Sequence, residues 1–127
     1  MKKILFGLLV VCFVSCKKQE GCTDSAAYNF NALAEKNDGS CLYYGKRSIW
    51  NNGGAHGNID IYISGNFVGT IANYFPGVDP ECESAGTLTN TMNPGTYTLY
   101  AIGTDGAEWN GNIIFNERVC TTYLLPD

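Results

Sequence analysis

The amino-acid sequence predicts a mainly β protein whose larger part is a small β-sandwich of about seven short strands. After residue 44, short apolar stretches recur, separated by Gly, Asn and Pro, which is typical of strands and turns. Fifteen glycines and eight tyrosines favour strands and tight turns over helices. With 45% hydrophobic and 16% charged residues, the composition is that of a globular chain. We therefore expect one small folded domain at 44–127 with shorter segments before it.

Residues 1–15 have the features of an export signal. A cationic start at Lys2 and Lys3 precedes an apolar run at 4–14. As a helix this run would be about 16 Å long, which is too short to cross a hydrocarbon core of about 30 Å. The segment therefore predicts a secretory signal that is removed from the mature chain.

The signal ends in Phe13-Val14-Ser15-Cys16, which resembles the lipobox of bacterial lipoproteins, with Phe where Leu is usual. The resemblance implies cleavage before Cys16, three acyl chains on that residue, and a lipidated tether at 16–20. Two or three acyl chains hold a protein durably on a bilayer. The implied location is the bacterial outer membrane, on its periplasmic or its surface face. The alternative is an ordinary secretory signal that leaves Cys16 a free thiol.

The charge balance excludes one class of partner. Twelve Asp and Glu exceed eight Lys and Arg, which gives a formal net charge of −4, and four of the cations lie in the first eighteen residues. Neutralising a phosphate backbone needs clustered cations. We therefore expect no nucleic-acid partner.

Four cysteines remain beyond the signal and the lipidation site: Cys22, Cys41, Cys82 and Cys120. An even number in an exported chain indicates disulfides, and three pairings are open. We expect Cys22 to pair with Cys41 and Cys82 with Cys120, because each pair brackets a segment of distinct composition. The two closed loops would contribute about 3 and 4 kcal/mol. A zinc site is the alternative, although no two cysteines have the short spacing that zinc sites use.

Residues 21–43 read GCTDSAAYNFNALAEKNDGSCLY. They resemble a cysteine-bounded motif common in exported proteins of Bacteroidetes, GCTDxxAxNYNxxAxxxDGSCxY. Phe30 replaces the usual Tyr, and Asn37 stands where the family often has Asp. The resemblance covers about a fifth of the chain and implies an extracytoplasmic setting rather than an activity.

The same segment is dense in side-chain oxygens. Ca²⁺ takes six to eight oxygen ligands, so one interpretation is a weak calcium site, and Ca²⁺ is the one cofactor we consider. The alternative is that these residues form Asx-turns within a disulfide-closed loop. The six residues are Asp24, Asn29, Asn31, Asn37, Asp38 and Ser40.

In the domain at 44–127, alternation and turn residues place the strands. Ile59, Ile61 and Ile63 alternate with polar residues, as in a half-buried strand. Turn sequences at 64–66, 93–95 and 117–118 predict three hairpins between consecutive strands. The only helical feature expected is a turn near 32–35. The seven expected strands are 47–50, 59–63, 67–72, 87–92, 96–102, 113–116 and 119–125.

Two glycine-bounded stretches, 61–69 and 93–99, resemble PEGA-like and carboxypeptidase-regulatory-like domains. Those families are small Ig-like β-sandwiches appended to surface proteins. The resemblance therefore implies an Ig-like or PEGA-like sandwich.

The sequence offers no catalytic constellation. His56 is the only histidine, and it lies in a glycine-rich loop without a partner for a nucleophilic triad. Asp79, Glu81 and Glu83 lie in a Pro-rich loop, where a solvated face is expected rather than the paired acids of a glycosidase. We therefore expect no enzymatic activity; a small carbohydrate-active enzyme is the remaining alternative.

Two tryptophans are candidate binding residues, Trp109 in the turn-like stretch 106–111 and Trp50. An aromatic side chain on a loop can stack on a sugar or anchor a protein contact, whereas the alternative for Trp109 is that it caps the core. The expected function is a membrane-anchored, non-catalytic module that binds an envelope protein or glycan. A purely structural envelope component without a ligand is the alternative.

Overall fold

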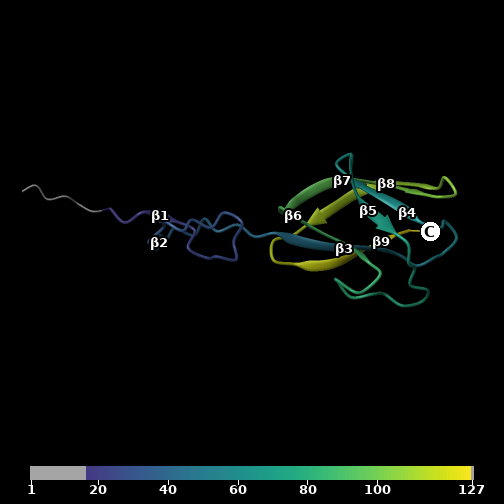
Figure 1. Ribbon diagram of the computed structural model, residues 1–127, viewed down its shortest axis with the longest axis horizontal. Helices are drawn as coiled ribbons and strands as arrows, with labels where there is room; N and C mark the ends of the chain where they lie inside the picture. The colour runs from purple at the N-terminus through teal and green to yellow at the C-terminus, as the bar shows by residue number, and fades with distance from the viewer. Residues whose placement is uncertain (1–16, 127) are drawn as a thin grey trace, which may run out of the picture.

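The computed structural model describes residues 17–126, so the expected signal and Cys16 lie outside the described residues. Figure 1 shows an elongated molecule with a small N-terminal module at one end and a two-layered β-sandwich at the other. The described residues contain nine strands and no helix, so there is no helix among them that could span a bilayer. The expected mainly β class is confirmed.

The sandwich consists of a three-stranded and a four-stranded sheet. In the first, the order is β6-β3-β9, and β3 pairs with β9 in parallel. In the second, the order is β5-β4-β7-β8, and all pairs are antiparallel. The strands are β3 (Gly45–Asn51), β4 (Ile59–Ile63), β5 (Asn66–Ile71), β6 (Leu88–Met92), β7 (Gly95–Gly103), β8 (Glu108–Phe115) and β9 (Cys120–Leu125).

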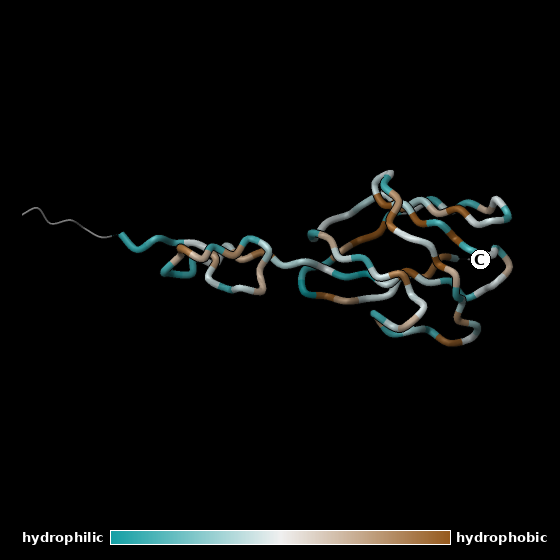
Figure 2. Tube along the Cα trace, in the orientation of Figure 1, coloured by the Kyte–Doolittle hydropathy of each residue, from teal (hydrophilic) through white to brown (hydrophobic). Residues whose placement is uncertain are grey.

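The core lies between the two sheets, where apolar positions recur at every second residue. Figure 2 shows the apolar residues concentrated along the strands of the sandwich. Removing such side chains from water is the main source of stability in a domain of this kind. The buried core residues are Ile49 and Leu125 from the three-stranded sheet and Ile59, Ile61, Ile63, Ile71, Leu99, Ala101, Ile113 and Phe115 from the four-stranded sheet.

All seven expected strands are present, and the hairpin of β4 and β5 is confirmed. Its two turn residues, Ser64 and Gly65, have φ angles of 50° and 78°. Positive φ at both positions is the requirement of a type I′ turn, whose twist matches that of antiparallel strands.

The other two expected hairpins are wrong. β6 and β7 follow each other in sequence but belong to different sheets, and so do β8 and β9. The turn residues at 93–95 and 117–118 reverse the chain, but they carry it from one layer to the other. β7 instead pairs with β8, across a turn at 104–107. Local turn chemistry specifies a reversal and leaves the partner of each strand undetermined.

β8 begins at Glu108, five residues before the expected start. Trp109 is therefore a strand residue paired with Ala101, and not part of a turn. The glycine and asparagines at 110–112 mask this strand in the sequence, because such residues are depleted in strands.

The N-terminal module, residues 20–43, is held by the disulfide between Cys22 and Cys41. Two short strands, β1 (Glu20–Gly21) and β2 (Lys36–Asn37), pair in parallel within it. The helical feature expected near 32–35 is a single turn, closed by a hydrogen bond from the Ala34 N–H to the Asn31 carbonyl.

A long covering loop, residues 72–87, packs on the outer face of the three-stranded sheet. The second disulfide, between Cys82 and Cys120, joins this loop to β9, so both bonds follow the expected local pairing. The loop buries Trp50, which is 3% exposed, and the Glu83 N–H donates to the buried Ser48 hydroxyl. β3 is consequently covered on both faces.

Candidate functional site

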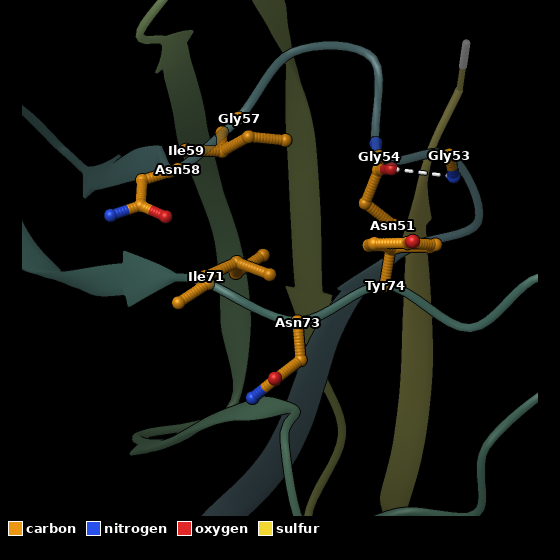
Figure 3. Close-up of a pocket in the computed structure, with 10 residues that line it drawn as sticks. Asn51, Gly53, Gly54, Gly57, Asn58, Ile59, Ile71, Asn73 and Tyr74 are labelled. Atoms are coloured by element: carbon orange, nitrogen blue, oxygen red, sulfur yellow. Dashed lines mark hydrogen bonds between the residues drawn. The ribbon is translucent and has the colours of Figure 1, made fainter.

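A small cavity lies at the end of the sandwich opposite the N-terminal module, where β3 leads into the loop at 52–58 (Figure 1). We call it the distal pocket; its volume is about 100 Å³. Figure 3 shows Asn58, Ile59, Ile71 and Asn73 along one side, with Asn51 and Tyr74 on the other. Its lining consists of Asn51, Gly53, Gly54, Gly57, Asn58, Ile59, Ile71, Ala72, Asn73 and Tyr74.

Asn51 shapes the pocket from the end of β3. Its side-chain oxygen accepts a hydrogen bond of 2.7 Å from the Gly53 N–H, which turns the chain away from the strand (Figure 3). The side chain is 1% exposed, and its Nδ2 has no hydrogen-bond partner. A buried amide N–H without an acceptor is destabilising, so Asn51, which lines the pocket, has an unused buried donor.

Two glycines of the loop at 52–58, Gly54 and Gly57, stand where a side chain would be unfavourable. A Cβ on Gly54 would lie 2.7 Å from Cε1 of Tyr74, so any other residue there would displace the tyrosine ring. Gly57 has a φ of +64°, which favours glycine. Tyr74 is 56% exposed and forms part of the rim.

The lining of the distal pocket contains no ionisable acid or base apart from the Tyr74 phenol. Asn51, Asn58 and Asn73 supply carboxamides, each of which can donate and accept hydrogen bonds. Such a lining suits recognition of a neutral polar group and supplies no general acid or base.

His56 lies beside the pocket and is paired rather than free. Its Nδ1 is 2.8 Å from Asp105 Oδ2, and its backbone carbonyl accepts from the Thr104 N–H. The pKa of Asp105 is lowered, mainly by the hydrogen bond from the Ala107 backbone N–H and next by the hydrogen bond with His56. The pair thus ties the loop at 52–58 to the β7–β8 turn.

Trp109 packs edge-on against His56, with ring centroids 5.1 Å apart. Its Nε1 donates to the Pro126 carbonyl at 2.6 Å, and its ring is half-buried against the core. This geometry is that of the capping alternative. Trp50 is not at the surface at all, because the covering loop stacks Phe75 edge-on against it at 6.1 Å; a binding role for Trp50 has no support in the structure.

The oxygens considered for calcium are engaged in local hydrogen bonds. Those of Asp24, Asn31, Asn37 and Asp38 each accept from a backbone N–H two residues ahead, which is the Asx-turn pattern. Asn29 bridges the loop, donating to the Ser40 carbonyl and accepting from the Leu42 N–H, both at 2.7 Å.

The carboxylate of Asp38 is held by the hydrogen bonds of such a turn. The Ser40 hydrogen bonds lower the pKa of Asp38, as expected for a carboxylate that accepts an amide. Across residues 17–126, no three His, Cys, Asp or Glu side chains gather as metal ligands would. The hydrogen bonds of Asp24, Asn31, Asn37 and Asp38 support the Asx-turn interpretation of this segment.

The three acidic residues of the covering loop are exposed, as expected for a solvated face. Glu83 forms an ion pair with Lys46 at 2.5 Å. Asp79 and Glu81 form no ion pair within the described part of the chain.

An aromatic cluster on the outer face of the four-stranded sheet was not predicted from the sequence. Tyr62 of β4 lies between Phe67 of β5 and Tyr100 of β7, with ring centroids 5.5 and 5.7 Å apart. The signal was available in the outward positions of the alternating strands. Cross-strand aromatic pairs of this kind stabilise a sheet, and this role accounts for the cluster.

The distal pocket was not predicted either, because its residues come from two separate stretches of sequence, 51–59 and 71–74. The only local signal was the density of Asn and Gly at 51–58.

Comparisons of the chain with protein-family models, curated proteins and solved structures gave no match.

Proposed function

We propose that this protein is a membrane-anchored bacterial lipoprotein that acts as a non-catalytic binding module, for a protein or a glycan, at the cell envelope. The signal-like stretch 1–15 and the lipobox-like cysteine Cys16 support the anchor. Two disulfides support an oxidising compartment, because such bonds are rare in the cytosol.

One observation carries the binding role: Asn51, which lines the distal pocket, has an unpaired buried amide donor, Nδ2, at the end of the molecule opposite the N-terminal module. A protein tethered near residue 16 would present that end to whatever it meets away from the membrane. The neighbouring ionisable groups, His56 and Asp105, bind each other. Recognition therefore fits this end better than catalysis does.

The anchor is tested by labelling cells with palmitate and comparing the wild type with Cys16→Ala. Label and detergent partitioning should be lost together in the variant. A wild-type protein that takes up no label would overturn the lipoprotein assignment.

The binding role is tested on the same cells by crosslinking the anchored protein to envelope components. The exposed Tyr74 is changed to Ala, with Phe67→Ala as a matched control at the aromatic cluster. Loss of crosslinks in Tyr74→Ala alone supports the binding module. Identical crosslinking in all three proteins would favour the structural envelope component instead.

A further inference from the structure

We infer that the distal pocket recognises a neutral carbohydrate, with the sugar ring on Tyr74 and one of its substituents inside the pocket. This inference rests on the proposed binding function and names the ligand class of the same site. It follows from the charge, size and hydrogen-bonding capacity of the pocket and from the aromatic ring at its rim.

The charge of the site selects a neutral ligand. None of the ten lining residues is charged. The ionisable groups beside the pocket, His56 and Asp105, contact each other at 2.8 Å. A phosphate, carboxylate or ammonium group would lose its hydration here without gaining a counter-charge, which is unfavourable.

The size of the pocket selects a substituent rather than a whole molecule. A volume of about 100 Å³ lies well below that of pockets that enclose complete small ligands. It suffices for one small polar group, such as a hydroxymethyl or acetamido arm. The rest of the ligand must then lie outside, against the rim.

The hydrogen-bonding groups match such an arm. Asn51 Nδ2 is a donor without an acceptor, and the carboxamides of Asn58 and Asn73 line the same space. Sugar hydroxyl and acetamido groups also act as both donors and acceptors, so amide side chains can satisfy them. Because Asn51 Nδ2 is sealed from solvent, the loop at 53–57 must shift slightly on binding, which its glycines allow.

The rim supplies a surface for the ring. Tyr74 is 56% exposed and its ring lies beside Gly54 at the rim. An exposed aromatic face is suited to the C–H face of a sugar. A peptide, by contrast, is usually recognised by pairing along a sheet edge or by larger apolar grooves, and the distal pocket is neither.

The experiment titrates the isotope-labelled full mature protein, in detergent micelles, with cellobiose, di-N-acetylchitobiose and a disaccharide that contains glucuronic acid. NMR follows the side-chain amides of Asn51, Asn58 and Asn73. We expect saturable shifts of these signals with at least one of the two neutral sugars, and weaker or no shifts with the acidic one.

Tyr74→Ala and Gly54→Ala test the site itself, and Phe67→Ala is their control. Tyr74→Ala should weaken binding at least tenfold, whereas Phe67→Ala, which removes an equally exposed aromatic ring elsewhere, should bind like the wild type. Gly54→Ala, whose Cβ would displace the Tyr74 ring, should also weaken binding, and the amide spectrum reports whether each variant is folded.

The outcomes separate this inference from the proposed function. Absence of shifts with both neutral sugars, or equal loss in Tyr74→Ala and Phe67→Ala, overturns the carbohydrate assignment. If Tyr74-dependent crosslinks to an envelope protein persist in that case, the binding module stands and its ligand is a protein. Absence of palmitate label would contradict the anchor without affecting sugar binding.

Discussion

Arg118 joins the sandwich to the N-terminal module by contacts that its own backbone conformation makes possible. With a φ of 58° it occupies the left-handed region, and its guanidinium lies 3.4 Å from the centre of the Tyr43 ring. Its Nη2 is 3.3 Å from Asp24 Oδ2, and its backbone N–H donates to the Tyr44 carbonyl. Charged, aromatic and backbone contacts thus converge on one residue, so the orientation of the module depends on it.

The carboxyl of Asp24 should report this junction through its titration. The Tyr43 hydroxyl, then the Ala26 N–H, then the Arg118 charge hold the pKa of Asp24 below its usual value of 3.8. A lowered folded-state pKa stabilises the fold above about pH 3.8, and that contribution is lost as the pH falls through the folded-state pKa. Tyr43→Phe should therefore raise the Asp24 pKa toward 3.8 in a carboxyl NMR titration.

Tyr44→Phe is the control for this experiment, because the Tyr44 ring packs against Tyr28 and its hydroxyl does not bind Asp24. Its Asp24 titration should match the wild type. An unchanged Asp24 pKa in Tyr43→Phe would show that the hydroxyl does not bind the carboxylate in solution.

At the scale of elements, the N-terminal module and the covering loop are both segments without a core of their own. The module buries Cys22 and Ala27 but leaves Phe30 and Leu33 exposed. A segment this small needs a covalent link and dense side-chain to backbone hydrogen bonds to hold one conformation. In both segments a disulfide supplies the link.

Asn29 distinguishes the two interpretations of the N-terminal module. Asn29→Asp keeps the acceptor for the Leu42 N–H but removes the donor to the Ser40 carbonyl, so the melting temperature should fall whether or not calcium is present. A calcium site would behave in the opposite way, because a new carboxylate strengthens binding of a hard cation. A rise in melting temperature with millimolar Ca²⁺ in this variant would contradict the Asx-turn interpretation.

The covering loop should leave the sheet when its disulfide is removed. Replacing both Cys82 and Cys120 by Ala should cost about 4 kcal/mol on the chain-entropy estimate. It should also expose Trp50, which is 3% exposed in the intact protein. With Trp109→Phe as background, tryptophan emission reports Trp50 alone and should shift to the red before global unfolding. Emission that stays blue until the whole protein unfolds would mean that the loop is held without the bond.

The strands could be predicted from the sequence and their pairing could not. Alternation of Ile59, Ile61 and Ile63 follows from the pleat itself, so a local pattern was sufficient. The partner of a strand depends on packing between distant segments, as with β9, which lies beside β3 although some seventy residues separate them. The same holds for the sites: the contact of Asp24 with Arg118 spans 94 residues, and no periodicity reports it.

At the scale of the whole molecule, β9 closes the core from the last part of the described chain. Leu125 is fully buried between the sheets, whereas its neighbour Leu124 is 40% exposed on the other face. Side chains of a strand alternate between faces. The pair therefore tests both the register of β9 and the two-layered arrangement.

Leu125→Ala should lower the free energy of unfolding by about 2–5 kcal/mol, because it leaves a cavity in a packed core. Leu124→Ala, one residue away, should change it by well under half as much. Urea denaturation of both variants measures the difference. Equal effects of the two substitutions would contradict the observed register.

The parallel pairing of β9 with β3 also decides when the molecule can acquire its shape as it is made. The N-terminal module has its two cysteines 19 residues apart and can close soon after it emerges. β3 must wait with one side unpaired until residues 120–125 appear, since its neighbour β9 is the last strand of residues 17–126. Exposed strand edges of this kind are prone to aggregate, so we expect a newly made chain to be most vulnerable to aggregation until β9 is available.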